Sequence, residues 1–261
     1  MSQHKWHMSQ WRIAQARSCG TSHLAESKPC QDFCLVDFVF AGEEPNCLLI
    51  AVADGAGSAA MSEIGSHVAC SAGIRHLKSC GDQLHDPTSA ERSIRASFFE
   101  ARRDVEEEAN RRKVESREMA TTLLLAVVTP DFAVFGQVGD GVVIYGEPSE
   151  LHAAHWAEQE ALNLTNFITG EPLDETLVVG LIREPIRRIM CSTDGLTQIL
   201  LDYRAKVPHK PIAERLFSTC GSAADPHSLS EDLQKFLDSD VVNERTDDDK
   251  TLVIAILEAG A

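Results

Sequence analysis

The sequence predicts an α+β fold, in which strands pair with strands near them in the chain and helices form separate groups. Strand-like runs follow one another, an order that argues against a parallel sheet wound with alternating helices. The chain has 261 residues and is 43% hydrophobic, which is enough to bury a sizeable core. No repeat, low-complexity segment or Pro/Ser-rich linker divides it. We therefore expect one domain over residues 11–261, preceded by a flexible leader over residues 1–10.

The first strands surround a turn-rich segment. Residues 11–17 alternate weakly between apolar and polar side chains, which indicates a first strand. Apolar, β-branched and aromatic side chains fill residues 32–40 and 47–53. Between them, residues 42–46 read Gly-Glu-Glu-Pro-Asn, a composition typical of a turn. The two runs are therefore predicted to form a β-hairpin.

Two helices are predicted next. Apolar residues recur at helical spacing over residues 62–80, and Gly81 fits the C-terminal end of that helix. A longer helix over residues 87–114 begins with Pro87, which suits a first helical turn. It has apolar residues on one face and many charges on the other, so we expect it to cover the core.

After Met119 the strand-like runs return. Residues 121–129, 132–138 and 142–146 are separated by Pro-Asp and Gly-Asp-Gly turns, which predicts a three-stranded meander. Further strands are expected over residues 162–169, 176–182 and 186–192, and helices over residues 197–202, 211–219 and 228–237. Residues 251–257 are almost entirely apolar and predict a central strand.

Charge and cysteine content exclude several classes of protein. The net charge of −16 argues against binding nucleic acid or an anionic membrane, since both favour a basic surface. The longest apolar runs are far shorter than the roughly 20 residues of a membrane span. The first residues lack the apolar segment of a signal peptide, and the eight cysteines form no CxxC pair. We therefore expect reduced thiols and a cytoplasmic location.

Four aspartates stand at predicted strand ends beside turns. Asp32 begins a strand, Asp54 and Asp194 each follow a strand and precede glycine, and Asp248 lies just before the last strand. If neighbouring strands bring these ends to one sheet edge, the carboxylates converge and repel one another. Mg²⁺ or Mn²⁺, which prefer oxygen ligands, would relieve that repulsion. Two such ions are suited to activating water and holding a phosphoryl group.

Each of these positions also has an ordinary explanation. Asp-Gly is a common turn dipeptide, so any single one is more often a turn than a metal ligand. The glycine after Asp54 would allow close approach of the backbone, and the carbonyl of Gly55 is a candidate ligand. The hypothesis of a metal site rests on the set of aspartates together.

The chain resembles the metal-dependent PP2C-type Ser/Thr protein phosphatases, in their bacterial single-domain branch. The resemblance covers residues 12–258 and rests on short motifs in the family's order: CQDFC (30–34), AVADGAGSA (51–59), TTLLLAVV (121–128), GQVGDGVVIYG (136–146), CSTDGLTQIL (191–200) and DDDKTLVIAI (247–256). It implies a four-layer αββα sandwich, in which two central antiparallel sheets are flanked by helices.

The resemblance also implies roles for single residues. Asp54 would bridge two ions, and the Gly55 carbonyl would bind one of them. Asp32 would act mainly through metal-bound water. Asp194 and Asp248 would complete the other side, Asp248 being preferred to Asp249 because residues 248–251 fit the family pattern Asp-Asn-x-Thr. Asp140 matches an aspartate that helps Asp194 to hold a weaker third ion.

Two departures from the family pattern concern the substrate. Ala56 stands where many eukaryotic members have a histidine proposed as general acid, so protonation of the leaving group is unassigned. Ser27 replaces a phosphate-binding arginine of some members. Lys28 or His23 are the candidates for that role, and a histidine that only ties down a loop is an equal interpretation of His23.

The predicted activity is direct attack of a metal-bridging water or hydroxide on phosphoserine or phosphothreonine, without a phosphoenzyme. Mn²⁺ or Mg²⁺ would be the cofactor, and a phosphorylated protein or its Ser/Thr kinase the partner of a monomeric enzyme. Cys191 lacks the Cys-x5-Arg loop of a tyrosine-phosphatase nucleophile. The alternatives are a catalytically weak binding or regulatory module on the same fold, and another two-metal phosphoester hydrolase. Loss of ligand aspartates would mark the first, and a nucleoside pocket the second.

Overall fold

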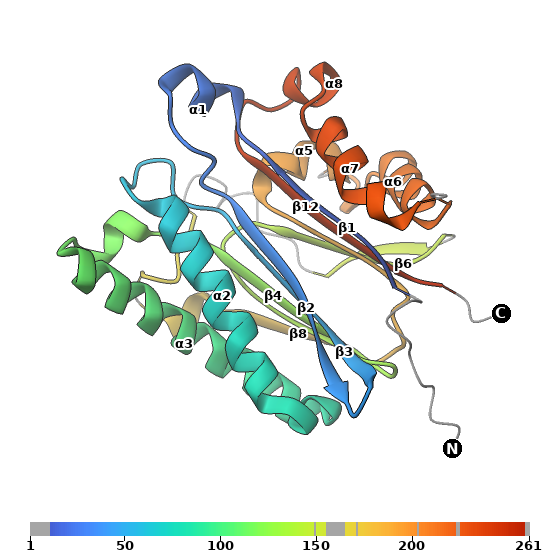
Figure 1. The fold of residues 1–261 in the computed structure, drawn as a ribbon. Helices are drawn as coiled ribbons and strands as arrows, with labels where there is room; N and C mark the ends of the chain where they lie inside the picture. The colour runs from blue at the N-terminus through green and yellow to red at the C-terminus, as the bar shows by residue number, and fades with distance from the viewer. Residues whose placement is uncertain are drawn as a thin grey trace.

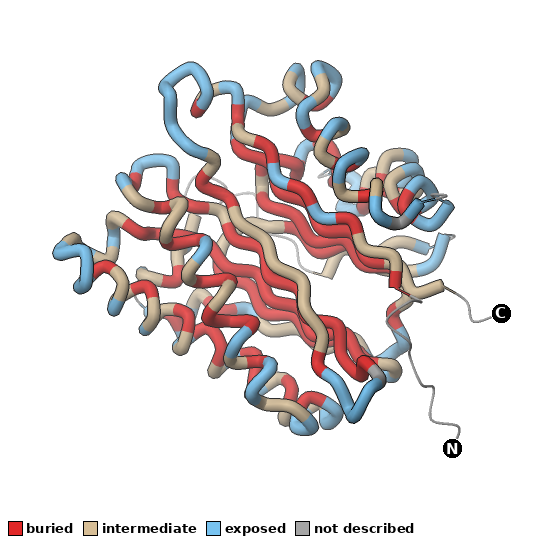
Figure 2. Tube along the Cα trace, viewed as in Figure 1, coloured by how far each residue is buried: buried red, intermediate tan, exposed pale blue. Residues whose placement is uncertain are grey.

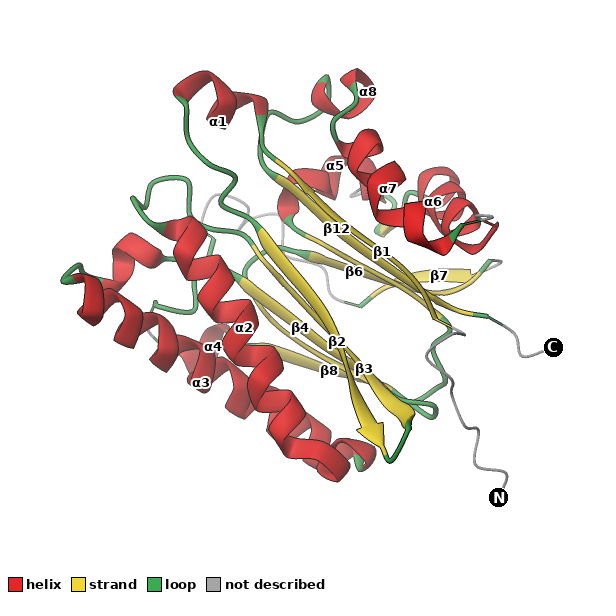
Figure 3. Cartoon of the chain, viewed as in Figure 1, coloured by secondary structure: helices red, strands yellow, loops and turns green. Residues whose placement is uncertain are grey.

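The computed structural model describes residues 11–148, 150–154, 165–170, 172–202, 204–222 and 225–258. Two five-stranded sheets stack face to face, and helices cover the outer face of each (Figures 1 and 3). Every strand pair within these sheets is antiparallel. The predicted α+β class and the four-layer sandwich are therefore confirmed. The predicted leader over residues 1–10 lies outside the described residues.

The first sheet has the order β2-β3-β4-β5-β8. Its strands are β2 (Phe33–Ala41), β3 (Glu44–Ala53), β4 (Leu123–Val128), β5 (Ala133–Val138) and β8 (Val178–Ile182). The predicted hairpin is confirmed, because β2 and β3 pair from Phe33 with Ala53 to the turn.

The second sheet has the order β1-β12-β9-β6-β7. Its strands are β1 (Trp11–Ser18), β6 (Val142–Glu147), β7 (Glu150–Ala153), β9 (Arg188–Ser192) and β12 (Lys250–Leu257). The last strand is central as predicted, since β12 pairs with both β1 and β9. A separate two-stranded ribbon joins β10 (Leu201–Asp202) to β11 (Val207–Pro208).

Long helices cover the first sheet and short ones the second (Figure 1). On the first sheet lie α2 (Ser62–Cys80) and α3 (Pro87–Arg112). On the second lie α5 (Thr197–Leu200), α6 (Lys210–Ser222), α7 (Leu229–Leu237) and α8 (Asp240–Asn243). Two further short helices are α1 (Thr21–Glu26) and α4 (Leu173–Thr176), and 3-10 turns span Gly81–His85, Ser116–Met119, Asp194–Leu196 and Pro226–Ser228.

The ends of the two long helices follow from their sequence. The Asp86 side chain accepts a hydrogen bond from the Ser89 N–H and so caps the N-terminus of α3, where Pro87 occupies the first turn. At the C-terminal end of α2, Gly81 has φ +51°, a conformation that glycine adopts without strain.

Three apolar layers hold the sandwich together (Figure 2). One lies between the first sheet and α2 and α3, and another between the second sheet and α5 to α8. The third lies between the sheets, where Leu48, Ile50 and Leu124 of the first sheet pack with Val143 and Val253 of the second. Burial of this apolar surface is the main free-energy gain of folding.

One predicted pairing and one predicted strand are wrong, although the strand predicted over residues 142–146 is present as β6. The meander ends after β5, because β6 leaves the first sheet and pairs with β9 in the second. The sequence of β6 is apolar enough for either sheet, so only the crossing of the chain decides. In the expected strand over residues 162–169, the described part, residues 165–169, has no strand conformation. Ile168 is nevertheless fully buried, because it packs against the first core layer.

Candidate active site

Two aspartates meet at one end of the first sheet. Asp32 immediately precedes β2 and Asp54 immediately follows β3. Because Phe33 pairs with Ala53 at the edge of that hairpin, the two aspartates lie next to each other. The main chain of Asp54 is fixed by Thr122, whose N–H donates to the Asp54 carbonyl at 2.8 Å and whose Oγ1 accepts from the Asp54 N–H at 2.9 Å.

The second sheet brings further aspartates to the same end. Ser192 at the end of β9 pairs with Leu252 near the start of β12, so Asp194 and Asp248 lie at adjacent strand ends. Asp140 lies in the turn that carries the chain from β5 to β6, and thus from one sheet to the other. The Thr193 hydroxyl donates to Asp32 Oδ2 at 2.8 Å and joins the two sheets directly.

Asp32 is the most deeply placed of these carboxylates. Only 1% of its surface is exposed, and Oδ1 is buried with no hydrogen-bond partner among the described residues. Burial raises the pKa of Asp32 to about 7, against the hydrogen bond from Thr193, which lowers it. A buried carboxylate oxygen without a partner is costly unless a cation or ordered water satisfies it.

The carboxylates raise one another's pKa values. Burial, and then the charges of Asp32, Asp194 and Asp248, raise the pKa of Asp54 well above its ordinary value. Burial, and then the charges of Asp140 and Asp248, raise the pKa of Asp194 to about 8. Partial burial of the Asp248 carboxyl group likewise raises its pKa, although the residue taken as a whole is exposed. Such mutual repulsion is what a bound cation would remove.

Asp140 shows the same incomplete satisfaction as Asp32. Its Oδ2 accepts a hydrogen bond from the Thr165 hydroxyl at 2.9 Å. Its Oδ1 is buried without a hydrogen-bond partner in the described part of the chain. The donor set at this end of the sandwich thus consists of carboxylate oxygens, two of them unsatisfied, which fits Mg²⁺ or Mn²⁺ better than a soft metal.

Glycines are needed where the strand ends crowd together. A Cβ on Gly55 would lie 2.7 Å from the Gln31 carbonyl oxygen and 2.8 Å from Ser62. A Cβ on Gly195 would overlap the carbonyl oxygen of Asp249. The glycine after Asp54 and the glycine after Asp194 therefore have a packing reason that is separate from any turn preference.

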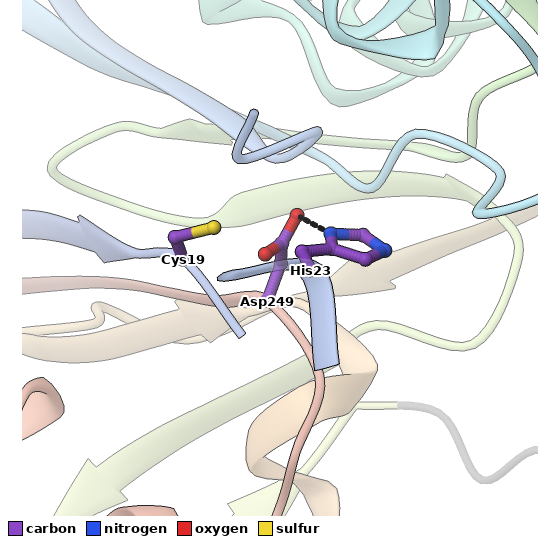
Figure 4. A group of neighbouring side chains, drawn as sticks. All are labelled: Cys19, His23 and Asp249. Atoms are coloured by element: carbon purple, nitrogen blue, oxygen red, sulfur yellow. Dashed lines mark hydrogen bonds and ion pairs between the residues drawn. The ribbon is translucent and has the colours of Figure 1, made fainter. Parts of the chain in front are cut away.

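Asp249 differs sharply from its neighbour Asp248. It is 2% exposed, and its carboxylate accepts hydrogen bonds from the N–H groups of Gly20 and Gln31, each at 2.6 Å. It also lies 2.9 Å from His23 Nδ1 (Figure 4). Sequence reasoning assigned no role to Asp249. The alternation of side chains along an extended chain means that consecutive residues face opposite sides, but a run of three aspartates does not show which one turns inward.

Cys19, His23 and Asp249 form a second group of metal-ligand atoms, all within 4.8 Å of one another (Figure 4). Both oxygens of Asp249 already accept hydrogen bonds from backbone N–H groups. Burial and the Asp249 charge raise the pKa of the Cys19 thiol, so thiolate is disfavoured. We therefore interpret this group as a hydrogen-bond network that joins α1 and the start of β12.

The two candidate phosphate-binding residues lie in different surroundings. Lys28 is exposed, and its Nζ is 2.7 Å from Glu26 Oε2. His23 is buried and uses Nδ1 toward Asp249. A Cβ on Gly57 would lie 3.8 Å from His23 Nε2, so this nitrogen faces the loop that follows Asp54.

Comparisons with known proteins identify relatives of this chain. A model of the family described as protein phosphatase 2C matches residues 19–238. Serine/threonine-protein phosphatase 3 of Escherichia coli (strain K12) is 32% identical over 256 residues, which cover 94% of this chain and 98% of that protein.

Solved structures resemble the fold at lower identity. Serine/threonine phosphatase Stp1 from Staphylococcus aureus has a TM-score of 0.66 at 15% identity, covering 99% of this chain and 100% of that one. PppA, a regulatory component of the T6SS in Pseudomonas aeruginosa, has a TM-score of 0.62 at 19% identity, covering 94% and 97%.

The family model and the Escherichia coli relative place the chain among serine/threonine protein phosphatases. The chain belongs to the protein phosphatase 2C family. Asp248 lies beyond the matched residues 19–238. Its place in the carboxylate cluster is therefore argued from the position of β12 and from its charge, which raises the pKa values of Asp54 and Asp194.

Proposed function

We propose that this serine/threonine-protein phosphatase hydrolyses phosphoserine and phosphothreonine at the cluster formed by Asp32, Asp54, Asp140, Asp194 and Asp248. The observation that carries the proposal is the convergence of these aspartates from both sheets. The raised pKa values of Asp32, Asp54 and Asp194 support a site built for cations, as do the Asp32 and Asp140 oxygens that have no partner among the described residues.

Mn²⁺ or Mg²⁺ is the proposed cofactor, as two ions with a weaker third. Asp54 and the Gly55 carbonyl would hold the ions on the first sheet, with Asp32 behind them. Asp194 and Asp248 would hold them on the second sheet, and Asp140 would join Asp194 at the third position. When bound, the ions supply the positive charge that stabilises the phosphoryl group in the transition state and activates water.

The nucleophile is proposed to be water, so that no phosphoenzyme forms. Three cysteines lie near the cluster, but none offers a thiolate. Burial raises the pKa of Cys191, which is fully inaccessible. Burial also raises the pKa of Cys30, together with the charge of Asp32, and that of Cys19, together with the charge of Asp249. The aspartates are therefore the groups left to orient the attacking water through the cations they hold.

His23 is the stronger candidate for contact with the substrate phosphate. Its Nδ1 is directed to Asp249, which is itself fixed by two backbone N–H groups. With Nδ1–H directed to Asp249, Nε2 is aimed at the loop after Asp54, where it would donate to a phosphate oxygen when the ring is protonated on both nitrogens. Lys28 would first have to leave Glu26, although an exposed ion pair of this kind costs little to break.

A phosphorylated protein, and through it a Ser/Thr kinase, is the proposed partner of a monomeric enzyme. A reducing compartment such as the cytoplasm is proposed because all eight cysteines are unpaired. No helix among the described residues is long and apolar enough to cross a membrane.

Substrate comparison tests the proposal most directly. Release of phosphate would be measured from a phosphothreonine peptide, from p-nitrophenyl phosphate and from nucleotides, with Mn²⁺ and with EDTA. We expect Mn²⁺-dependent turnover of the peptide that EDTA abolishes. Faster turnover of nucleotides would favour a different phosphoester hydrolase, and Mn²⁺ binding without turnover of any substrate would favour a binding module.

A further inference from the structure

A cavity of about 530 Å³ lies under the short helices, away from the carboxylate cluster. The residues that line it belong mainly to α5, α6, α7, α8, β1 and β12, and Figure 3 labels these elements. The lining is mainly apolar and includes Ala14, Ile212, Leu216, Leu233, Phe236 and Ile254. This volume falls within the range of about 300–1,000 Å³ that is typical of small-molecule sites.

Two arginines give this apolar cavity a cationic rim. Arg215 on α6 and Arg245 after α8 both line it and are exposed. Neither forms an ion pair with a carboxylate in the described part of the chain, and the guanidinium of Arg245 donates to the Val241 carbonyl at 2.8 Å. The one lining carboxylate, Asp232, is already paired with Lys235 at 2.9 Å. The rim therefore has positive charge to offer to a ligand.

We propose that this cavity binds a single-chain amphiphile with a carboxylate head group, of the fatty-acid type. The hydrocarbon chain would lie among the apolar side chains of α6 and α7, where the burial of each methylene favours binding. The carboxylate would lie at the rim, where Arg215 and Arg245 supply charge-assisted hydrogen bonds. An uncharged chain would use the cavity but not the arginines.

The position of α8 connects this cavity to the carboxylate cluster. Val241 and Val242 of α8 line the cavity, and Asp248 follows a few residues later. Asn243, the last residue of α8, accepts a hydrogen bond at 2.8 Å from Nζ of the fully buried Lys250. An occupant that moves α8 would thus move the segment that carries Asp248, and we expect bound amphiphile to change the rate of phosphate release.

Binding would be measured by calorimetry with dodecanoate and with dodecanol, both below the concentration at which dodecanoate forms micelles. We expect the wild type to bind dodecanoate about tenfold or more tightly than dodecanol. The double variant Arg215→Gln/Arg245→Gln should lose that preference and keep its affinity for dodecanol. Arg95→Gln, at an exposed position on α3, is the matched control and should change neither affinity.

A second variant tests the cavity itself. Leu216 is only partly buried, so Leu216→Trp should fill the cavity while the protein stays folded, and it should weaken both ligands. Failure of the wild type to bind either ligand would overturn the proposal, as would equal affinity for the two or an unchanged preference in the double arginine variant. These binding results do not depend on catalysis, so they stand whether or not the phosphatase assay succeeds.

Discussion

The two halves of the sandwich differ in how their helices meet their sheet. On the first sheet, α2 has 19 residues and α3 has 26. Both lie close to the sheet: a Cβ on Gly73 of α2 would be 2.9 Å from Leu125 Cδ2, and a Cβ on Gly136 of β5 would be 2.5 Å from Ile94 Cγ2 of α3. On the second sheet, α6 has 13 residues and α7 has 9, and a cavity remains beneath them.

This difference in packing gives the two halves different roles at the carboxylate cluster. In the first half the long helices pack closely on the sheet, which favours a fixed position for Asp32 and Asp54. The second half holds Asp194 and Asp248 but has room for a ligand next to the helix that leads to Asp248. The cluster exists only where the two halves meet, and both must be in place for it to work.

The largest expected effect comes from removing one carboxylate from each half. Asp54→Asn and Asp194→Asn should each lower phosphate release by more than 100-fold, because loss of a proposed metal ligand should exceed the 10–100-fold typical of its outer partners. Calorimetric titration with Mn²⁺ should show weaker or fewer sites in both variants.

Asp131→Asn is the control for this pair, since Asp131 is exposed at the opposite end of β5. If only the Asp54 variant lost activity, the second half would not contribute to the site, and the comparison between the halves would fail.

The next largest effect is expected from pH on the unfolding free energy of the metal-free protein. The folded-state pKa of Asp194 is about 8, above the value of 3.8 for an unperturbed carboxyl, so the folded chain binds more protons than the unfolded one between these values. Its contribution to stability is therefore present at low pH and is lost as the pH rises toward 8. The slope is up to about 1.4 kcal/mol per pH unit for each such carboxyl.

Urea unfolding in EDTA at pH 5 and at pH 8 would measure this. Asp194→Asn should flatten the dependence, and saturating Mn²⁺ should raise the stability of the wild type most at pH 8. The prediction would be contradicted if, in EDTA, the unfolding free energy of the wild type changed between pH 5 and pH 8 in the same way as that of the variant.

A smaller effect is expected at the contact that joins the halves. Asp249 precedes β12 of the second sheet, and its carboxylate accepts from Gln31 N–H, next to Asp32 of the first. Asp249→Asn places an N–H group where an acceptor is needed and should cost about 1–3 kcal/mol of unfolding free energy. Asp247→Asn, at an exposed position nearby, is the control and should change the unfolding free energy by less than about 0.5 kcal/mol. Equal effects would mean that the Asp249 contacts do not hold the site together.

The smallest effects compare packing directly. Gly136→Ala adds a methyl group against Ile94 and Phe98 and should destabilise the first half by about 1–3 kcal/mol. Val242→Ile adds one methylene beside the cavity and should be neutral or stabilising by up to about 0.8 kcal/mol. Thermal unfolding of both variants would measure this, and an equal loss of stability would show that the second half has no room to spare.

Much of the fold could be predicted because it depends on local pattern. The hairpin of β2 and β3, the helix α2 with Gly81 at its end and the central strand β12 all follow from periodicity and turn residues over short windows. The strand expected over residues 162–169 is absent from its described part, residues 165–169. Ile168 is buried by tertiary contacts, and in the sequence such an apolar residue cannot be told apart from one in a strand.

The sequence by itself determined which aspartates stand at strand ends beside turns, and its motifs pointed to the family. Only the tertiary structure decided that β6 crosses to the second sheet and so brings Asp140 close to Asp194. It also decided that Asp249 turns inward while Asp248 stays at the cluster. The physical reason is that convergence of charges and satisfaction of a buried carboxylate depend on which distant segments meet, and this is set by packing of the whole chain.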